Sequence, residues 1–560
     1  MKFNEKTGEC LLALLRKREV EVRSLVVRQD GDVVFSHATA PFPLDHVHPL
    51  YSVTKSFTSC AVGMLVEQGA VDINAPWVSY LPEYGAKALD SRFCEVSVRD
   101  LLTMQLGQDA EPQLQGDDDW ALGVAGKPLA NDLGTAFFYN SLCSHLLSIL
   151  VERVSGQTLD RFLEKRLFEP LGISRWWWEH DRQGHATGGF GLHLSTPDLA
   201  KFGQCLLDGG TWEGRRVVPS DWVREATRKQ VETRPFYPDS STEDRNGYGY
   251  QYWMCAGGGF RCSGLWGQLC YVLPEQRLVV ASSSATSGSK PVMDALYDVL
   301  RIETNYRAAC PKEELPAAPD KAQRSALDVL PMPQGAAVPT VTRGAAVATS
   351  PQGAAALTSS AKTATSASIL QLFLGQHAVR ESHEGFTSFS LSFDEPSHGS
   401  NCFAKKGATG CQVVEEDAAG CQGVEGDAAS SQDAERGAVE GSCLKLAIVR
   451  DGKTYEVRAG YGAWAPLADA CPGVGELFPF ATASAEVIEP PTWDTKTTFG
   501  AYAWKNPSTL EIVSRELDET RRCVVTVRLD GNHIVLEIGV QNMMCGLVPT
   551  RYALVSDLRR

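Results

Sequence analysis

The chain has 560 residues, of which 43% are hydrophobic and 22% are charged, and it carries a formal net charge of −15. Its length exceeds what a single hydrophobic core usually supports, so we expect two or three domains. The acidic balance argues against a nucleic-acid partner, because such a protein needs a basic face to offset phosphate charge.

The N-terminal segment does not have the composition of an export signal. Leu11–Leu15 is a run of five apolar residues flanked by charge, whereas a secretory signal needs about 7–15. No stretch approaches the roughly 20 apolar residues of a membrane span, so we predict a cytoplasmic protein with no membrane partner. The 16 cysteines form no Cys-x-x-Cys pair, and we expect them to be reduced and packed as small core residues.

The region 1–305 contains both helical and strand patterns. Strands at its two ends, with helices between them, indicate an α/β (α+β) domain whose sheet joins the two ends. The first two strands are separated by the turn Asp30-Gly31-Asp32. Helices are predicted at 8–17, 52–68, 97–106, 141–154, 158–167, 196–208 and 291–301, and strands at 24–29, 33–36, 269–273 and 278–283.

The composition changes after this domain. Residues 306–367 are rich in Ala, Pro, Thr and Ser and predict a linker, because they cannot bury enough apolar surface to offset the entropy of ordering. Residues 368–560 contain short alternating segments such as SFSLSF and HIVLEIG, which predict a β-rich C-terminal domain. Within it, residues 407–442 hold an imperfect acidic repeat, and we expect a disordered insert there.

A serine and a lysine stand three residues apart at Ser52-Val53-Thr54-Lys55. The same spacing occurs three more times in the chain, so the tetrapeptide alone decides little. Ser52 differs because it opens a predicted amphipathic helix that ends at Gly69. At such a position the hydroxyl meets the positive end of the helix dipole, and Lys55 lies one turn later on the same side. A serine hydroxyl is a poor nucleophile until a base takes its proton. A half-buried lysine with a depressed pKa can take that proton, or it can hold a second base deprotonated.

Two further motifs follow in chain order. Phe138-Tyr139-Asn140-Ser141 directly precedes a predicted helix, and Arg261-Cys262-Ser263-Gly264-Leu265 precedes the strand LCYVL. A Ser-His-Asp triad is the rival chemistry. The histidine candidates for such a triad are His180, His185 and His193. Two other features stand apart from the triad. At least one residue of the triplet Trp176-Trp177-Trp178 must pack structurally, and the acidic run Asp117-Asp118-Asp119 is expected to be a solvated loop.

The three motifs, in this order, resemble the β-lactamase/penicillin-binding-protein superfamily of serine hydrolases. The resemblance covers about residues 20–305 and is nearest to the 6-aminohexanoate-dimer-hydrolase-like and class C-like branch; the segments VSVRDLLTMQLG and GGFGLHLSTPDLAKFGQ add to it. It implies a β-lactamase/transpeptidase-like domain with an antiparallel sheet flanked by helices. Residues 500–531 resemble the β-rich domain that is appended to some serine hydrolases of this branch, so the resemblance also fits the predicted C-terminal domain.

The resemblance also implies roles for the site residues. Ser52 would be the nucleophile, with Lys55 beside it. Tyr139, its pKa lowered by the lysine, would be the general base and later protonate the leaving group. Ser141 would hydrogen-bond Lys55 or the substrate, and the backbone N–H of Leu265, with that of Ser52, would form the oxyanion hole.

One motif position departs from the family pattern. The residue that opens the third motif is a lysine or histidine in β-lactamases, where it helps to bind the substrate carboxylate, and here it is Cys262, followed by Ser263 and Gly264. This shifts the expected substrates from β-lactams toward small esters or amides, 6-aminohexanoate oligomers among them. We expect no metal and no organic cofactor. The alternative hypothesis is a sensor that binds a peptide or acyl compound without turnover.

Overall fold

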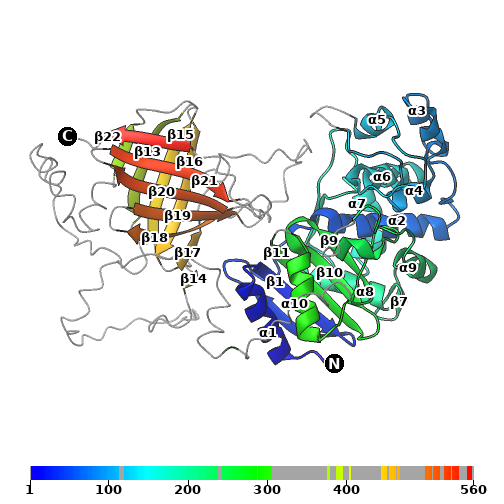
Figure 1. Ribbon diagram of the computed structural model, residues 1–560, viewed down its shortest axis with the longest axis horizontal. Helices are drawn as coiled ribbons and strands as arrows, with labels where there is room; N and C mark the ends of the chain where they lie inside the picture. The colour runs from blue at the N-terminus through cyan, green and yellow to red at the C-terminus, as the bar shows by residue number, and fades with distance from the viewer. Residues whose placement is uncertain are drawn as a thin grey trace, which may run out of the picture. The chain divides into compact units, whose positions relative to one another are not determined.

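The computed structural model describes residues 2–112, 119–237, 243–286 and 288–304, residue 319, and eleven strands between residues 375 and 557 (Figure 1). The described residues fall into two compact units, one N-terminal and one formed by the late strands. The predicted linker, apart from residue 319, lies outside the described residues. The same holds for the acidic insert, so both domain boundaries stay predictions.

The largest sheet of the N-terminal unit is antiparallel and has six strands. Its order is β2-β1-β11-β10-β9-β8, and the pairing of β1 with β11 confirms that one sheet joins the two ends of this region. The predicted turn between β1 and β2 has positive φ at Asp30 and Gly31, as a tight two-residue hairpin requires. The strands are β1 (Glu21–Gln29), β2 (Asp32–Ala38), β8 (Trp253–Met254), β9 (Phe260–Gly264), β10 (Gln268–Leu273) and β11 (Leu278–Ala285).

Helices follow the predicted positions with some changes in length. The segment predicted at 97–106 forms only α4 (Val98–Leu102), and α7 (Leu159–Leu163) continues as a π-helical turn over Glu164–Phe168. The other helices are α1 (Glu5–Lys17), α2 (Thr54–Glu67), α3 (Pro82–Gly85), α5 (Trp120–Ala125), α6 (Ser141–Ser155), α8 (Thr196–Leu207), α9 (Ser220–Ala226) and α10 (Lys290–Leu300). Short strands complete the unit: β3 (His48–Pro49), β4 (Trp177–Trp178), β5 (Leu192–Leu194), β6 (Thr211–Trp212) and β7 (Arg215–Arg216).

The sheet separates two hydrophobic cores. On one face, Leu25 and Val27 of β1 join the core that α1 and α10 share. On the other, Val26 joins a larger core with α2, α6 and α8. Successive side chains of a strand point to opposite faces, so the continuous apolar run of β1 serves both cores.

The helix α2 lies inside the larger core. All residues from Thr54 to Leu65 are buried, so the prediction of an amphipathic helix was wrong. The reason is packing on several sides, since α6, α7, α9 and β9 all contact α2. Small residues permit this close packing; a Cβ at Gly63, for example, would overlap the ring of Trp222.

The second unit is one eleven-stranded sheet. Its main order is β12-β13-β15-β16-β18-β19-β20-β21-β22, with β14 and β17 off this path. Alternate residues Leu444, Leu446 and Ile448 are buried, as the period of a strand with one covered face requires. The strands are β12 (Gly375–Ala378), β13 (Phe386–Asp394), β14 (Phe403–Ala404), β15 (Cys443–Arg450), β16 (Lys453–Tyr461), β17 (Ala463–Pro466), β18 (Thr498–Asn506), β19 (Thr509–Glu516), β20 (Arg522–Asp530), β21 (His533–Gln541) and β22 (Tyr552–Asp557).

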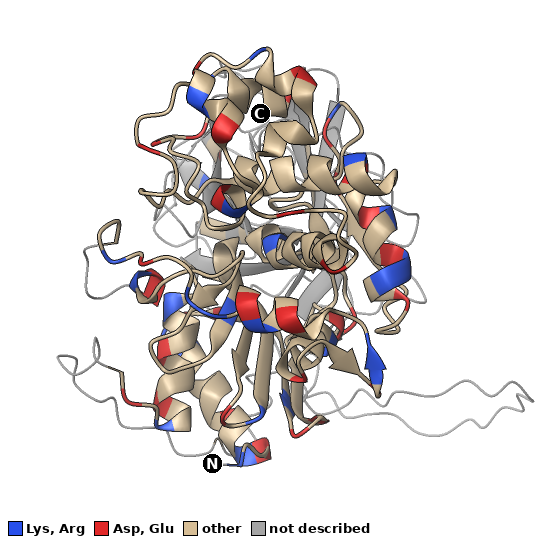
Figure 2. Cartoon of the chain, turned by 90° about the vertical axis from the view of Figure 1, so that its right-hand side faces the viewer, with Lys and Arg blue, Asp and Glu red and all other residues tan. Residues whose placement is uncertain are grey.

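Charged residues of both signs are interspersed over the outer elements of the N-terminal unit (Figure 2). Within the part of the chain that the structure describes, no helix combines the length and apolarity needed to cross a membrane.

Candidate active site

Ser52 lies in a short 3-10 turn, η1 (Tyr51–Val53), directly before α2. The preceding residue Tyr51 has φ of 48°, a left-handed conformation that costs a tyrosine free energy and that persists at functional sites when the surroundings enforce it. The turn is held by a hydrogen bond from the Val53 N–H to the Leu50 carbonyl at 3.2 Å. Ser52 therefore sits just before the first turn of α2 rather than within it.

Lys55 is the central charged group of the site. Its Nζ donates to Ser52 Oγ at 3.0 Å, to Ser141 Oγ at 3.3 Å and to the Gly189 carbonyl at 2.7 Å. The residue is 1% exposed. Burial lowers the pKa of Lys55 to about 7, although the carboxylate of Glu111 acts in the opposite direction. A lysine with this pKa exists partly as the free amine near neutral pH, and the free amine can accept a proton.

Tyr139 lies next to both Ser52 and Lys55. The phenol is hydrogen-bonded to the Ser52 hydroxyl, and Nζ of Lys55 lies 4.8 Å from the ring centroid. The ring stacks on Trp253 at 5.3 Å between centroids. Burial raises the pKa of Tyr139 well above its ordinary value. The family resemblance implied a lowered pKa for this tyrosine, whereas here desolvation by burial acts in the opposite direction and is the largest cause of the shift.

Ser141 is the first residue of α6 and faces Lys55. The helix starts here because the Asn140 side chain accepts a hydrogen bond from the Leu142 N–H at 2.8 Å, a typical N-cap. The backbone N–H of Ser141 donates to the exposed Glu111 carboxylate. Glu111 thus brings a negative charge to the site that the sequence patterns did not indicate.

The third motif lies on β9, which contacts the turn that holds Ser52. A Cβ at Gly264 would lie 2.2 Å from the Leu50 carbonyl oxygen, so glycine at 264 lets β9 approach the segment that precedes Ser52. Ser263 is half-buried on β9, and Leu265, 37% exposed, follows the strand.

Cys262 of the same strand faces the protein interior. It is 1% exposed and its thiol contacts Ser56 and Cys270, while burial raises its pKa well above the ordinary value. Such a thiol is a small packed group and not a nucleophile. Its neighbour Arg261 is fully buried and bonded to Asp244.

Two glycines complete the surroundings of Lys55, and the sequence reasoning assigned them no role. The Gly188 carbonyl accepts from Thr58 Oγ1 at 2.7 Å, and the Gly189 carbonyl accepts from Lys55. A Cβ at either position would come within 2.6 Å or less of a backbone oxygen of α6. The Gly-Gly pair in GGFG was the available signal, because adjacent glycines permit close backbone approach.

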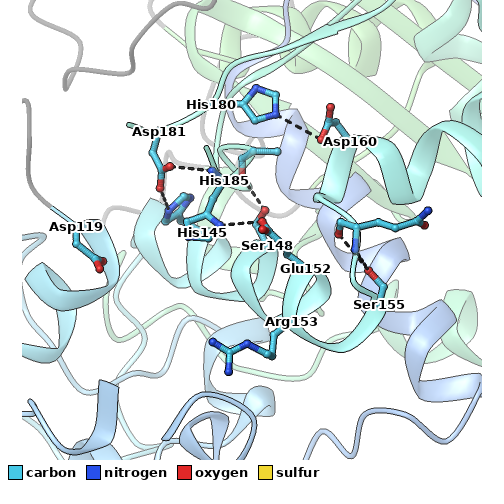
Figure 3. Close-up of polar contacts among 12 residues, drawn as sticks. Asp119, His145, Ser148, Glu152, Arg153, Ser155, Asp160, His180, Asp181 and His185 are labelled. Carbon is cyan, nitrogen blue, oxygen red and sulfur yellow. Dashed lines mark hydrogen bonds and ion pairs between the residues drawn. The ribbon is translucent and has the colours of Figure 1, made fainter. Parts of the chain in front are cut away.

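The histidines considered for a triad each pair with a carboxylate instead of a serine. His180 lies 3.4 Å from Asp160, and Figure 3 shows His185 beside the helix that carries Glu152. In the described part of the chain, no serine hydroxyl is hydrogen-bonded to the imidazoles of His180, His185 or His193, so the triad hypothesis has no geometric support.

The other candidates have structural contacts. Asp119 caps α5 by accepting from the Leu122 N–H at 3.0 Å, whereas Asp117 and Asp118 lie outside the described residues. Trp178 is buried and donates from its indole to the Thr187 carbonyl at 3.0 Å, which confirms that at least one of the three tryptophans packs structurally.

The chain is similar to several known proteins over about half of its length. The 6-aminohexanoate-dimer hydrolase of Paenarthrobacter ureafaciens is 29% identical over 302 residues, which cover 48% of this chain and 74% of that protein. A penicillin-binding protein homologue from Caulobacter crescentus has a TM-score of 0.42 at 17% identity, covering 53% of this chain and 99% of that structure. A family VIII carboxylesterase has a TM-score of 0.43 at 17% identity, covering 52% and 96%.

A match to a protein family covers the N-terminal unit. Residues 13–303 of the 560 match the family described as Beta-lactamase, and this range contains all three motifs. The chain therefore belongs to the β-lactamase family of hydrolases.

Proposed function

We propose that the protein is a serine hydrolase that cleaves small esters or amides through an acyl-enzyme on Ser52. One observation carries the proposal: Nζ of a buried lysine with a pKa of about 7 lies 3.0 Å from the Ser52 hydroxyl oxygen. Such a pair supplies both the nucleophile and its base.

Acylation follows from these contacts. The free amine of Lys55 accepts the Ser52 proton while Oγ forms a bond to the substrate carbonyl carbon. Tyr139, whose raised pKa keeps it protonated, donates its O–H proton to the leaving alkoxide or amine as the carbon–heteroatom bond breaks. The Lys55 ammonium then returns a proton to the Tyr139 oxygen, so the proton count balances.

Deacylation uses Lys55 as the base again. A water molecule attacks the acyl carbon and Lys55 accepts its proton. The Ser52–acyl bond then breaks, and the Lys55 ammonium returns that proton to Oγ, which regenerates the free amine. We propose that the backbone N–H groups of Ser52 and Leu265 stabilise the oxyanion in both steps, and that Ser263 and Gly264 line the acyl group.

The charges around the site favour substrates without a carboxylate next to the scissile bond. Cys262 stands where a cation would bind such a carboxylate, and the guanidinium of Arg261 is fully buried and bonded to Asp244. Glu111 adds a negative charge beside Ser141. We therefore rank neutral esters and amides above β-lactams. The relative from Paenarthrobacter ureafaciens is named as a hydrolase of the 6-aminohexanoate dimer.

The experiment is a substrate panel with a nucleophile variant. The parent and Ser52→Ala are treated with a fluorophosphonate probe and assayed on a p-nitrophenyl ester, an anilide and nitrocefin. We expect labelling and ester hydrolysis in the parent alone. Ester hydrolysis that survives in Ser52→Ala would refute the mechanism, and labelling without turnover on any of the three substrates would favour a sensor instead.

A further inference from the structure

One face of α6 is bonded to the segment formed by residues 181–189. His145, Ser148 and Glu152 are three and four residues apart, so their side chains lie along one side of the helix. Figure 3 shows these side chains together with Asp181 and His185 of the segment. The bonds join Nε2 of His145 to Oδ2 of Asp181 at 3.0 Å, Oγ of Ser148 to the Ala186 carbonyl at 2.6 Å, and Oε2 of Glu152 to Nδ1 of His185 at 2.8 Å.

The His145–Asp181 pair is the buried part of this contact. Both side chains are 1% exposed. Oδ1 of Asp181 accepts from the His185 backbone N–H at 2.9 Å, so both carboxylate oxygens have a donor. Burial raises the pKa of Asp181, but the bonds from His145 and His185 outweigh it and hold the pKa below its ordinary value. Nε2 of His145 donates to the Asp181 carboxylate, whereas Nδ1 has no hydrogen-bond partner in the described part of the chain.

The other end of the segment reaches the catalytic lysine. Gly188 and Gly189 lie so close to α6 that a Cβ would come within 2.3 Å of the Ser144 carbonyl oxygen and 2.6 Å of the Ser141 carbonyl oxygen. The Gly189 carbonyl then accepts from Nζ of Lys55 at 2.7 Å. Eight residues along the chain therefore connect Asp181 to an atom that contacts the proposed base.

We propose that His145 and Asp181 are a positioning pair: by holding segment 181–189 against α6, they keep the Gly189 carbonyl at Nζ of Lys55. The inference rests on the proposed function, because its effect passes through Lys55. A carbonyl that accepts from an ammonium group stabilises the charged form. The other groups that face Lys55 are Ser52, Ser141 and Cys143, the Tyr139 ring and the Glu111 carboxylate.

The test variant is Asp181→Asn. An amide offers one acceptor where the carboxylate offers two, so its NH₂ group must face the donor of either His145 or His185. A change of His145 tautomer would relieve the clash but would leave a buried Nδ1–H without an acceptor among the described residues. We expect kcat/KM for p-nitrophenyl acetate to fall about tenfold at pH 8, because Lys55 loses its orientation. We also expect the acidic limb of the pH profile to move to lower pH, because the ammonium form loses an acceptor.

Two further variants separate positioning from general destabilisation. His145→Gln retains a donor near Nε2, and we expect its pH profile to match that of the parent. Asp160→Asn is the matched control. It removes a buried carboxylate of α7 that pairs with His180 and, among the described residues, makes no bond to His145 on α6. We expect this control to lower the melting temperature while the pH profile keeps its midpoint.

The rates are divided by the fraction of protein that a fluorophosphonate labels, which corrects for misfolded molecules. A profile of Asp181→Asn that superimposes on the parent after this correction would overturn the inference. So would an equal shift in His145→Gln or in Asp160→Asn. Failure of the proposed function is recognised separately, since ester hydrolysis would then persist in Ser52→Ala.

Discussion

The burial of Lys55 predicts a specific pH dependence of acylation. A group acts as a base only when it is deprotonated, and the pKa of Lys55 is lowered to about 7. We therefore expect kcat/KM for a neutral ester to rise with pH, to reach half of its plateau near pH 7, and to fall about tenfold for each unit below pH 6. Tyr139 adds no second limb below pH 9, because its pKa is raised.

The size of the effect follows from the shift itself. A change of the lysine pKa from 10.5 to about 7 corresponds to roughly 5 kcal/mol of differential stability between the two protonation states. An unperturbed lysine would be neutral in only about 0.03% of molecules at pH 7, whereas about half are neutral at the lowered pKa. Burial thus raises the concentration of the base by about a thousandfold.

The assay is p-nitrophenyl acetate hydrolysis from pH 5 to pH 9, with the Lys55→Arg variant as the matched control. Arginine keeps the positive charge but does not deprotonate in this range. We expect Lys55→Arg to lose at least about a hundredfold in kcat/KM at pH 8. A flat profile between pH 5 and pH 8 in the parent, or near-parent activity in Lys55→Arg, would refute the assignment of Lys55 as the base.

Three other variants test the same site. Tyr139→Phe removes the O–H bonded to Ser52. We expect kcat to fall by a factor of about 10²–10⁴ while the acidic limb of the pH–rate profile stays in place. A displaced limb would contradict the assignment of Lys55 as the base and Tyr139 as the acid. Gly264→Ala places a Cβ 2.2 Å from the Leu50 carbonyl oxygen. We expect a lower melting temperature and slower labelling by a fluorophosphonate. Labelling at the parent rate would show that β9 can move away from Leu50 without disturbing Ser52. Lys55→Met should raise the melting temperature most at pH 7 and below, and should not raise it near pH 10.5. The reason is that protonation of Lys55 disfavours the folded state only below the pKa of 10.5 that the lysine has in the unfolded chain. The melting temperatures are measured by calorimetry, and an equal gain at both pH values would contradict this.

Motif order predicted the part of the site that depends on side chains. The three motifs follow one another in the order that the family resemblance implies. The structure brings Ser52, Lys55, Tyr139 and Ser141 of the first two motifs into contact. Each of these motifs combines a reactive side chain with a recognisable local element. Such combinations are visible in a sequence because helix starts and strand ends have residue preferences.

Backbone contacts were harder to predict than side-chain motifs. Every residue has a carbonyl, so no residue type marks Gly189 as an acceptor for Lys55; only the close approach to α6 explains the glycine. The raised pKa of Tyr139 is a related case. Its largest cause is desolvation by burial, and burial depends on the packing of the whole unit, which the tyrosine motif does not contain.

The character of α2 shows why burial cannot be derived from one helix alone. Its periodic apolar residues suggested a helix with one exposed face, but its polar positions Thr54, Ser56, Thr58 and Ser59 are buried as well. They are satisfied by contacts outside the helix, such as Thr58 with the Gly188 carbonyl and Ser56 with the Gln251 carbonyl. Small hydroxyl side chains hydrogen-bond equally well to water and to protein, so their sequence pattern does not distinguish the two.

This burial connects the fold directly to the chemistry. Desolvation is the largest cause of the lowered Lys55 pKa, and the nearby Glu111 charge opposes it. A neighbouring cation would also lower the pKa of a lysine, but position 262, the first of the third motif, is a buried cysteine. The lowered pKa of Lys55 therefore depends on the packing of α6, α7, α9 and β9 around α2. Substitutions that admit water to this core should raise the Lys55 pKa and move the acidic limb upward, even where they touch none of the reacting groups.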